Sequence, residues 1–140
     1  MVPVKLTSED LAFLRRPLYG FFTVAAGAEE PQPRPVWFEA TDIGTIELFT
    51  LADAAKVRRL RTDPRASLVV AAPVGEPEHW VSVAGTVTLE SQGAQELAAR
   101  LAARYWDLGD RGRSTELEQM LGAELLRLVI NPQKVARYTP

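Results

Sequence analysis

The chain has 140 residues, of which 46% are hydrophobic and 24% charged, with a net charge of -2 at pH 7. It contains no cysteine and one histidine, His79, which excludes disulfides, thiolate ligands, cysteine nucleophiles and histidine-rich metal sites. The length is typical of one domain, and no apolar run is long enough for a signal segment or membrane span. We therefore predict a single domain over residues 1–140, cytoplasmic, with no metal site and no membrane partner.

The first half of the chain predicts two helices and three strands. Thr7 with Asp10 three positions later is typical of a capping box, so a short helix begins there and ends before Pro17. Aromatic and β-branched residues predict a strand over 18–26, followed by a Gly- and Pro-rich turn. Two short strands over 35–40 and 45–50 surround the sequence TDIG, and a basic helix follows from about Asp53 to Thr62.

The second half alternates strands with amphipathic helices. Strands are predicted over 66–72 and 80–90, and helices over 91–106 and 113–122. Two closing strands, 125–131 and 134–138, are expected to be separated by Pro132. About six or seven antiparallel strands with peripheral helices indicate a mainly β (α+β) fold, a barrel of short strands.

The basic helix concentrates positive charge in an acidic protein, with five basic side chains in ten positions: Lys56, Arg58, Arg59, Arg61 and Arg65. Val57 and Leu60 define its buried stripe, so helical spacing puts Lys56 and Arg59 on one side. If Asp53 caps the helix, Lys56 lies in the first turn, where a cation opposes the helix dipole. A bound anion would reverse that effect, which favours a phosphate site. The alternative is a solvated helix face paired with acidic residues.

Four segments carry a resemblance to a known family: RPVWFEA, LFTLADAAKVRRLRTDPRASLVV, WVSVAGTVTLE and LLRLVINPQKV. In order and spacing they resemble the split-barrel flavoproteins related to pyridoxamine 5'-phosphate oxidase, including the smaller flavin and deazaflavin oxidoreductases. The resemblance covers roughly residues 18–135. Its most specific part is the spacing of Thr50, Lys56, Leu60 and Pro64 ahead of a Val-x-Val-x-Gly strand that begins at Val81.

The resemblance implies a split β-barrel that forms a homodimer, with coenzyme F420 or FMN in a groove at the interface. It implies that Lys56 binds the cofactor phosphate, assisted by the neighbouring basic residues, and that two strands hold the ring. Trp80 joins this set because it is an aromatic residue that a partner subunit is expected to cover. The expected cofactor-binding residues are Val36, Trp37, Phe38, Phe49, Thr50, Lys56, Arg58, Arg59, Arg61 and Trp80. No residue is assigned a catalytic role.

The residue chemistry agrees with such a ligand and leaves alternatives open. Both cofactors join a flat ring to a phosphate, so they need an apolar slot with positive charge at some distance. Trp37 and Phe38 are consecutive in a predicted strand and face opposite sides, one towards the core and the other towards a slot or partner. They could equally be ordinary core and dimer contacts, Thr50 could begin the helix, and Tyr105 and Trp106 are expected to pack on the barrel.

We therefore expect an oxidoreductase that passes hydride between F420 or FMN and a small-molecule substrate. The alternatives are a cofactor-binding barrel without turnover and a nucleic-acid-binding module that uses the basic helix. A pI of about 5.5 and the lack of aromatic residues among the arginines disfavour nucleic acid. The longer anionic tail of F420 suits Arg58, Arg59 and Arg61 slightly better than FMN does. The Arg/Lys-rich strand and C-terminal substrate segment of authentic pyridoxamine phosphate oxidases are not visible, and the single histidine disfavours a haem-degrading relative.

Overall fold

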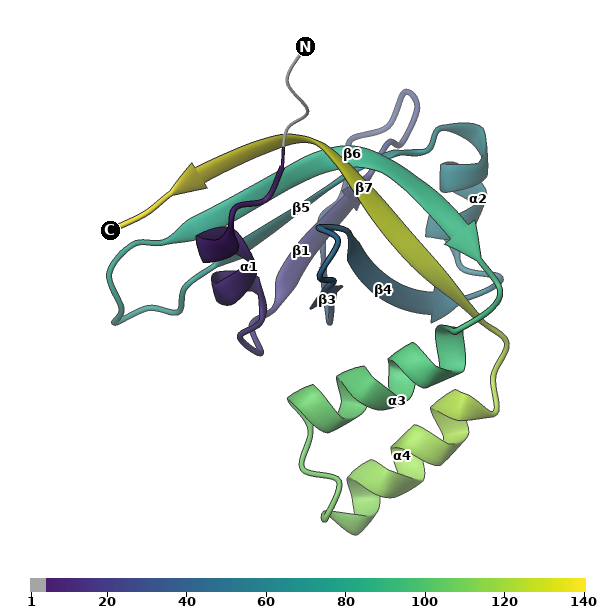
Figure 1. Ribbon diagram of the computed structural model, residues 1–140. Helices are drawn as coiled ribbons and strands as arrows, with labels where there is room; N and C mark the ends of the chain where they lie inside the picture. The colour runs from purple at the N-terminus through teal and green to yellow at the C-terminus, as the bar shows by residue number, and fades with distance from the viewer. Residues whose placement is uncertain (1–4) are drawn as a thin grey trace.

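Seven antiparallel strands form one curled sheet in the computed structural model, which describes residues 5–140 (Figure 1). Four helices accompany the sheet in these residues, which confirms the predicted mainly β (α+β) class. The elements in chain order are α1 (Ser8–Leu14), β1 (Gly20–Val24), β2 (Arg34–Val36), β3 (Glu39–Ala40), β4 (Ile46–Leu51), α2 (Ala55–Thr62), β5 (Arg65–Ala71), β6 (Trp80–Glu90), α3 (Ala94–Tyr105), α4 (Arg111–Leu121) and β7 (Leu125–Tyr138).

The sheet curls because one short connection joins its two edges. The strand order is β2-β1-β5-β6-β7-β4-β3, so β2 and β3 lie at opposite edges. Only Trp37 and Phe38 separate these strands in the chain, and two linking residues span no more than about 10 Å between the strand ends. The sequence predicted one strand over 35–40, which is wrong, because the chain leaves one edge at Val36 and joins the other at Glu39.

The long β6 and β7 pair closes the fold with one irregularity. β7 is continuous across Pro132, whereas the sequence predicted two strands separated there. The register shifts between Ala84 and Gly85, and this bulge leaves Gln133 unpaired and accommodates the proline. A Cβ atom at position 85 would overlap the carbonyl oxygen of Asn131, so the bulge requires the glycine.

The core fills the inside of the curled sheet. Alternate residues of β4, β5 and β6 point inward, and Phe38 is fully buried among them. The capping box of α1 forms as predicted: Thr7 accepts a hydrogen bond from the Asp10 N–H, and the Asp10 carboxylate accepts one from Thr7. Helix α1 therefore starts where the sequence indicated and covers the core with Phe13 and Leu14.

Helices α3 and α4 lie side by side as a hairpin beyond one end of the sheet (Figure 1). Helix α3 buries one face, on which Leu97 and Leu101 point inward. Helix α4 buries none of its residues, so it forms an outer layer. In the part of the chain that the structure describes, no helix has the length and apolar character needed to span a membrane.

Candidate functional site

A cleft of about 460 Å³ lies where the β2–β3 connection meets the helical hairpin. We call it the aromatic cleft, since four of its lining side chains are aromatic. Its lining residues come from six parts of the chain: Tyr19, Pro35, Val36, Trp37, Phe49, Lys56, Trp106, Glu116 and Met120.

Trp37 is held in place by three aromatic neighbours. Its ring stacks nearly parallel to Tyr105 with centroids 5.3 Å apart, and it meets the edges of Trp106 at 4.7 Å and Phe49 at 6.4 Å. The Tyr105 hydroxyl donates a hydrogen bond to the Leu18 carbonyl at 2.6 Å. Burial raises the pKa of Tyr105, so its hydroxyl stays protonated at neutral pH. The cleft wall is therefore an apolar surface of packed aromatic rings, of the kind that suits a planar ligand ring.

Positive charge gathers at the α2 side of the aromatic cleft. Lys56 also lines an adjoining space of about 240 Å³, the basic hollow, together with Val24, Gln32, Arg34, Ala54, Ala55 and Arg59. The Lys56 ammonium is half-buried and lies 5.9 Å from the ring centroid of Phe22. Burial and the nearby Arg34 lower the pKa of Lys56. Among residues 5–140 it has no carboxylate partner. A bound anion would therefore stabilise the charged ammonium and raise the pKa of Lys56.

The start of α2 adds to the positive potential. The sequence predicted Asp53 as its cap, but the N-cap is Ala54, which makes no side-chain cap hydrogen bond. The reason is a turn in which the Ala54 N–H donates to the Leu51 carbonyl, so the helix begins after Asp53. No acidic residue lies in the first turn. Ala54 and Ala55 line the basic hollow, so the uncapped helix end faces it.

The positive charge continues along α2 into a third space of about 530 Å³, which we call the arginine hollow. Arg58, Arg59 and Asp63 line it, and the Asp63 carboxylate is paired with Arg65 at 2.8 Å. Arg59 also lines the basic hollow. Arg58 donates to the Asp53 carbonyl at 2.7 Å, and Arg59 contacts the Glu29 carboxylate at 3.4 Å. The three spaces form a row, because the first two share Lys56 and the last two share Arg59.

The structure brings most of the predicted site residues together. Val36, Trp37, Phe49 and Lys56 line the aromatic cleft. Arg58 and Arg59 lie further along the row in the arginine hollow. The buried stripe of Val57 and Leu60 forms as predicted, which places Lys56 and Arg59 on the same side of α2.

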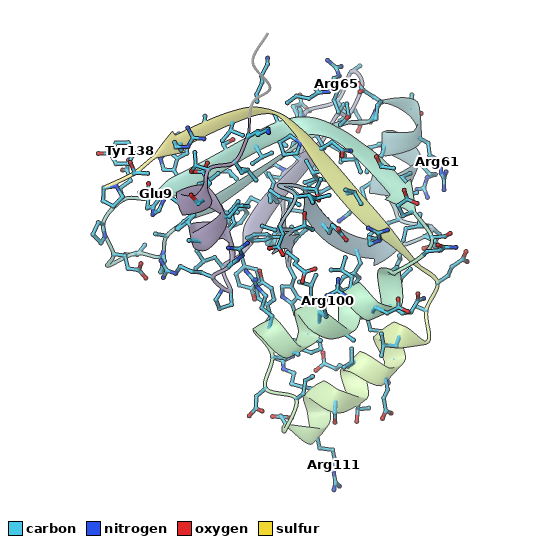
Figure 2. All side chains as sticks on the ribbon, viewed as in Figure 1. Glu9, Arg61, Arg65, Arg100, Arg111 and Tyr138 are labelled. Carbon is cyan, nitrogen blue, oxygen red and sulfur yellow. The ribbon has the colours of Figure 1, made fainter. Side chains whose placement is uncertain are left out.

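Four predicted residues lie elsewhere. Phe38 has a fully buried side chain in the core, so that side chain is not available to a ligand. Thr50 pairs with Leu126 on β7 and does not line the aromatic cleft. Trp80 lies at the start of β6, opposite Tyr138, and is also absent from the cleft lining. Arg61 is exposed and extends from α2 away from the sheet (Figure 2).

Several lining residues carry no recognisable signal in the sequence. Arg34 lies in the Pro-rich segment that was assigned to a turn, and Tyr19, Glu116 and Met120 were not singled out. Trp106 packs against aromatic neighbours as expected, but it also lines the cleft. No periodicity links these positions, because each reaches the cleft from a different element.

Comparison with known proteins identifies the family. A profile described as pyridoxamine 5'-phosphate oxidase matches residues 6–135. No curated protein matches the sequence significantly.

Many solved structures share the fold, and three of them are similar to this chain as follows. A conserved hypothetical protein from Mycobacterium tuberculosis has 20% identity and a TM-score of 0.72, with 97% of this chain and 86% of that chain covered. A protein named F420 reductase has 21% identity and a TM-score of 0.70, covering 89% and 94%. A heme binding protein from Mycobacterium smegmatis has 23% identity and a TM-score of 0.58, covering 91% of this chain and 50% of that one. Since the profile spans nearly the whole chain, the protein belongs to the pyridoxamine 5'-phosphate oxidase family.

Proposed function

We propose that the protein is an oxidoreductase that binds F420 or FMN and transfers hydride to or from a small-molecule substrate. The observation that carries this proposal is the aromatic cleft beside Lys56, whose half-buried ammonium has no carboxylate partner among residues 5–140. An apolar aromatic surface beside a cation matches a ligand that joins a planar ring to a phosphate. The family and the neighbour named F420 reductase support the same ligand class.

Each part of the site has a separate task in this proposal. Trp37 and Phe49 hold and orient the ring and exclude water from one of its faces. Lys56, with Arg34 and Arg59 in the basic hollow, binds the phosphate at the uncapped start of α2. The bound cofactor supplies the hydride chemistry, and the protein supplies binding and orientation.

The row of hollows favours F420 over FMN by a small margin. FMN ends at one phosphate, which the basic hollow can satisfy. F420 continues past its phosphodiester into carboxylates, and the arginine hollow next along the row offers Arg58 and Arg59. A heme ligand, as named for two structural neighbours, fits less well, because the chain's single histidine stacks on Phe13 at 3.9 Å and lies outside the aromatic cleft.

Titration of the purified protein with F420 and with FMN tests the proposal, followed by an absorbance assay for hydride transfer to candidate acceptors. We expect Arg58→Glu to weaken F420 binding more than FMN binding, with an effect that shrinks as salt screens the charges. Arg59→Glu should weaken the binding of both cofactors, because Arg59 also lines the basic hollow that holds the phosphate. Arg61→Glu is the matched control, since it makes the same charge reversal on the same helix but points away from the sheet. Equal losses for both ligands in Arg58→Glu would contradict a tail site in the arginine hollow. Binding of neither ligand would contradict the proposed function.

We also propose that a second copy of the chain covers the outer face of β1 and β5. Phe21 and Val69 are directly paired on neighbouring strands, and both are exposed at 44% and 38%. Tyr19, which is 59% exposed, lies beside this face and lines the aromatic cleft. A partner on this face would therefore border the cleft, and the exposed aromatic surface favours such an interface.

Light scattering at micromolar concentration should give a mass of about 31 kDa, twice the 15.4 kDa of one chain. Phe21→Glu should lower that mass towards the mass of one chain, because it replaces one apolar side chain of the Phe21–Val69 pair with a charged one. Val74→Glu is a suitable control, since Val74 is an exposed apolar residue in the loop between β5 and β6. A parent protein with the mass of one chain would contradict the dimer.

A further inference from the structure

We propose that Glu116 determines substrate charge at the aromatic cleft, so that the cleft accepts planar substrates that are cationic or rich in N–H donors and disfavours anionic ones. The inference rests on the proposed function and adds a substrate class to it. Of the nine residues that line the cleft, two carry a charge: Lys56 from α2 and Glu116 from α4.

The two charges have different surroundings and therefore different tasks. Lys56 is shared with the basic hollow, where Arg34 and Arg59 make an anion site. Glu116 lines the aromatic cleft but neither of the other two hollows. It lies on the side of the cleft that Trp106 and Met120 form. With a phosphate neutralising Lys56, Glu116 is the remaining charged side chain among the residues that line the cleft.

The neighbouring Arg113 forms an ion pair with this carboxylate, which holds it in place and offsets part of its charge. The Arg113 guanidinium lies 4.7 Å from the ring centroid of Trp106, and it donates to Oε1 of Glu116 at 3.2 Å. Arg113 does not line the cleft, since it sits over the indole. The contact uses Oε1, and Oε2 stays available to accept a hydrogen bond. A carboxylate accepts hydrogen bonds and attracts cations, and it repels another carboxylate.

The Glu116 side chain contributes little to the stability of the fold. It belongs to α4, which buries none of its residues, and its side chain is 52% exposed. An exposed pair of this kind contributes little to stability. Substitution of Glu116 therefore changes the charge of the cleft while the protein stays folded.

Two acridine probes of equal ring size test the proposal: proflavine, which is cationic, and acridine-9-carboxylate, which is anionic. Binding to the full chain is measured by fluorescence polarisation in phosphate buffer, which screens Lys56. The parent should prefer proflavine. Glu116→Gln should reduce that preference about threefold, the size expected for one half-exposed charge, and Glu116→Lys should reduce it further. Glu118→Gln is the matched control, since Glu118 is exposed on the same helix and does not line the cleft.

The proposal is overturned if Glu116→Gln changes the probe preference no more than Glu118→Gln does, or if the parent binds neither probe. It is also overturned if Glu116→Gln weakens FMN and F420 binding by as large a factor as it reduces the preference for proflavine. Glu116 would then belong to the cofactor site. Unchanged cofactor affinity in that variant supports the assignment to substrate. Failure of the parent to bind either cofactor overturns the proposed function itself, whatever the probes show.

Discussion

Lys56→Ala is expected to weaken the binding of FMN or F420 by about 1.5–3 kcal/mol, or roughly 10- to 150-fold in Kd, the range for a charged hydrogen bond. The physical reason is that the Lys56 ammonium is half-buried, uncompensated by a carboxylate, and close to the uncapped start of α2. A fluorescence titration of each variant measures the loss. Folding should be largely unaffected, because the substitution removes a partly desolvated charge near Arg34.

Lys134→Ala is the matched control, since Lys134 is an exposed lysine on β7 outside the three hollows. Affinity should also depend on pH. Burial and Arg34 lower the pKa of Lys56, so its ammonium loses the proton at a lower pH than an ordinary lysine does. Cofactor binding should therefore weaken as the pH rises above neutral. Lys56→Arg should remove this pH dependence. Unchanged affinity in Lys56→Ala would show that the phosphate binds elsewhere.

Arg137→Met is expected to lower the free energy of unfolding by about 2 kcal/mol at pH 7. Arg137 donates hydrogen bonds to both carboxylate oxygens of Asp10, at 2.9 Å and 2.8 Å, and the Asp10 side chain is 1% exposed. Removal of the guanidinium leaves a buried charge with only its capping contacts. Fully buried pairs cost about 3–5 kcal/mol when one partner is lost, and the Arg137 side chain is 37% exposed, so the expected loss is smaller.

The same pair predicts how stability changes with pH. Burial raises the pKa of Asp10, but hydrogen bonds from Arg137 and Thr7 outweigh it, and the net pKa lies below its ordinary value. A group with a lowered folded pKa stabilises the fold above its unfolded pKa of about 4 and loses that contribution as pH falls through the folded value. The difference between the parent and Arg137→Met should therefore be largest at neutral pH and shrink on acidification.

Urea denaturation at pH 7 and at pH 3 measures both effects. Arg65→Met is the matched control, because Arg65 also makes two contacts to one carboxylate, that of Asp63, but its side chain is 76% exposed. We expect a small loss for that surface pair. Equal losses in the two variants would show that burial of Asp10 does not set the strength of its ion pair.

The local features of this protein could be predicted from its sequence. The Thr7 and Asp10 capping box, the alternation along β6, and the place of Lys56 in the first turn of α2 were all predicted correctly. These features depend on residues within a few positions of each other, so periodicity and capping chemistry suffice to predict them. The family, and with it the split-barrel fold, also followed from the order and spacing of short segments.

Contacts between distant parts of the chain could not be predicted from the sequence, because they depend on how the sheet closes. Trp37 and Phe38 leave the predicted strand because they join the two edges of the sheet, which sends Phe38 into the core and Trp37 into the aromatic cleft. Glu116 reaches that cleft only through the packing of the helical hairpin. Asp10 and Arg137 lie 127 positions apart, and no local pattern encodes their contact. Such pairings depend on sheet register and curvature, which emerge only when the whole chain closes around its core.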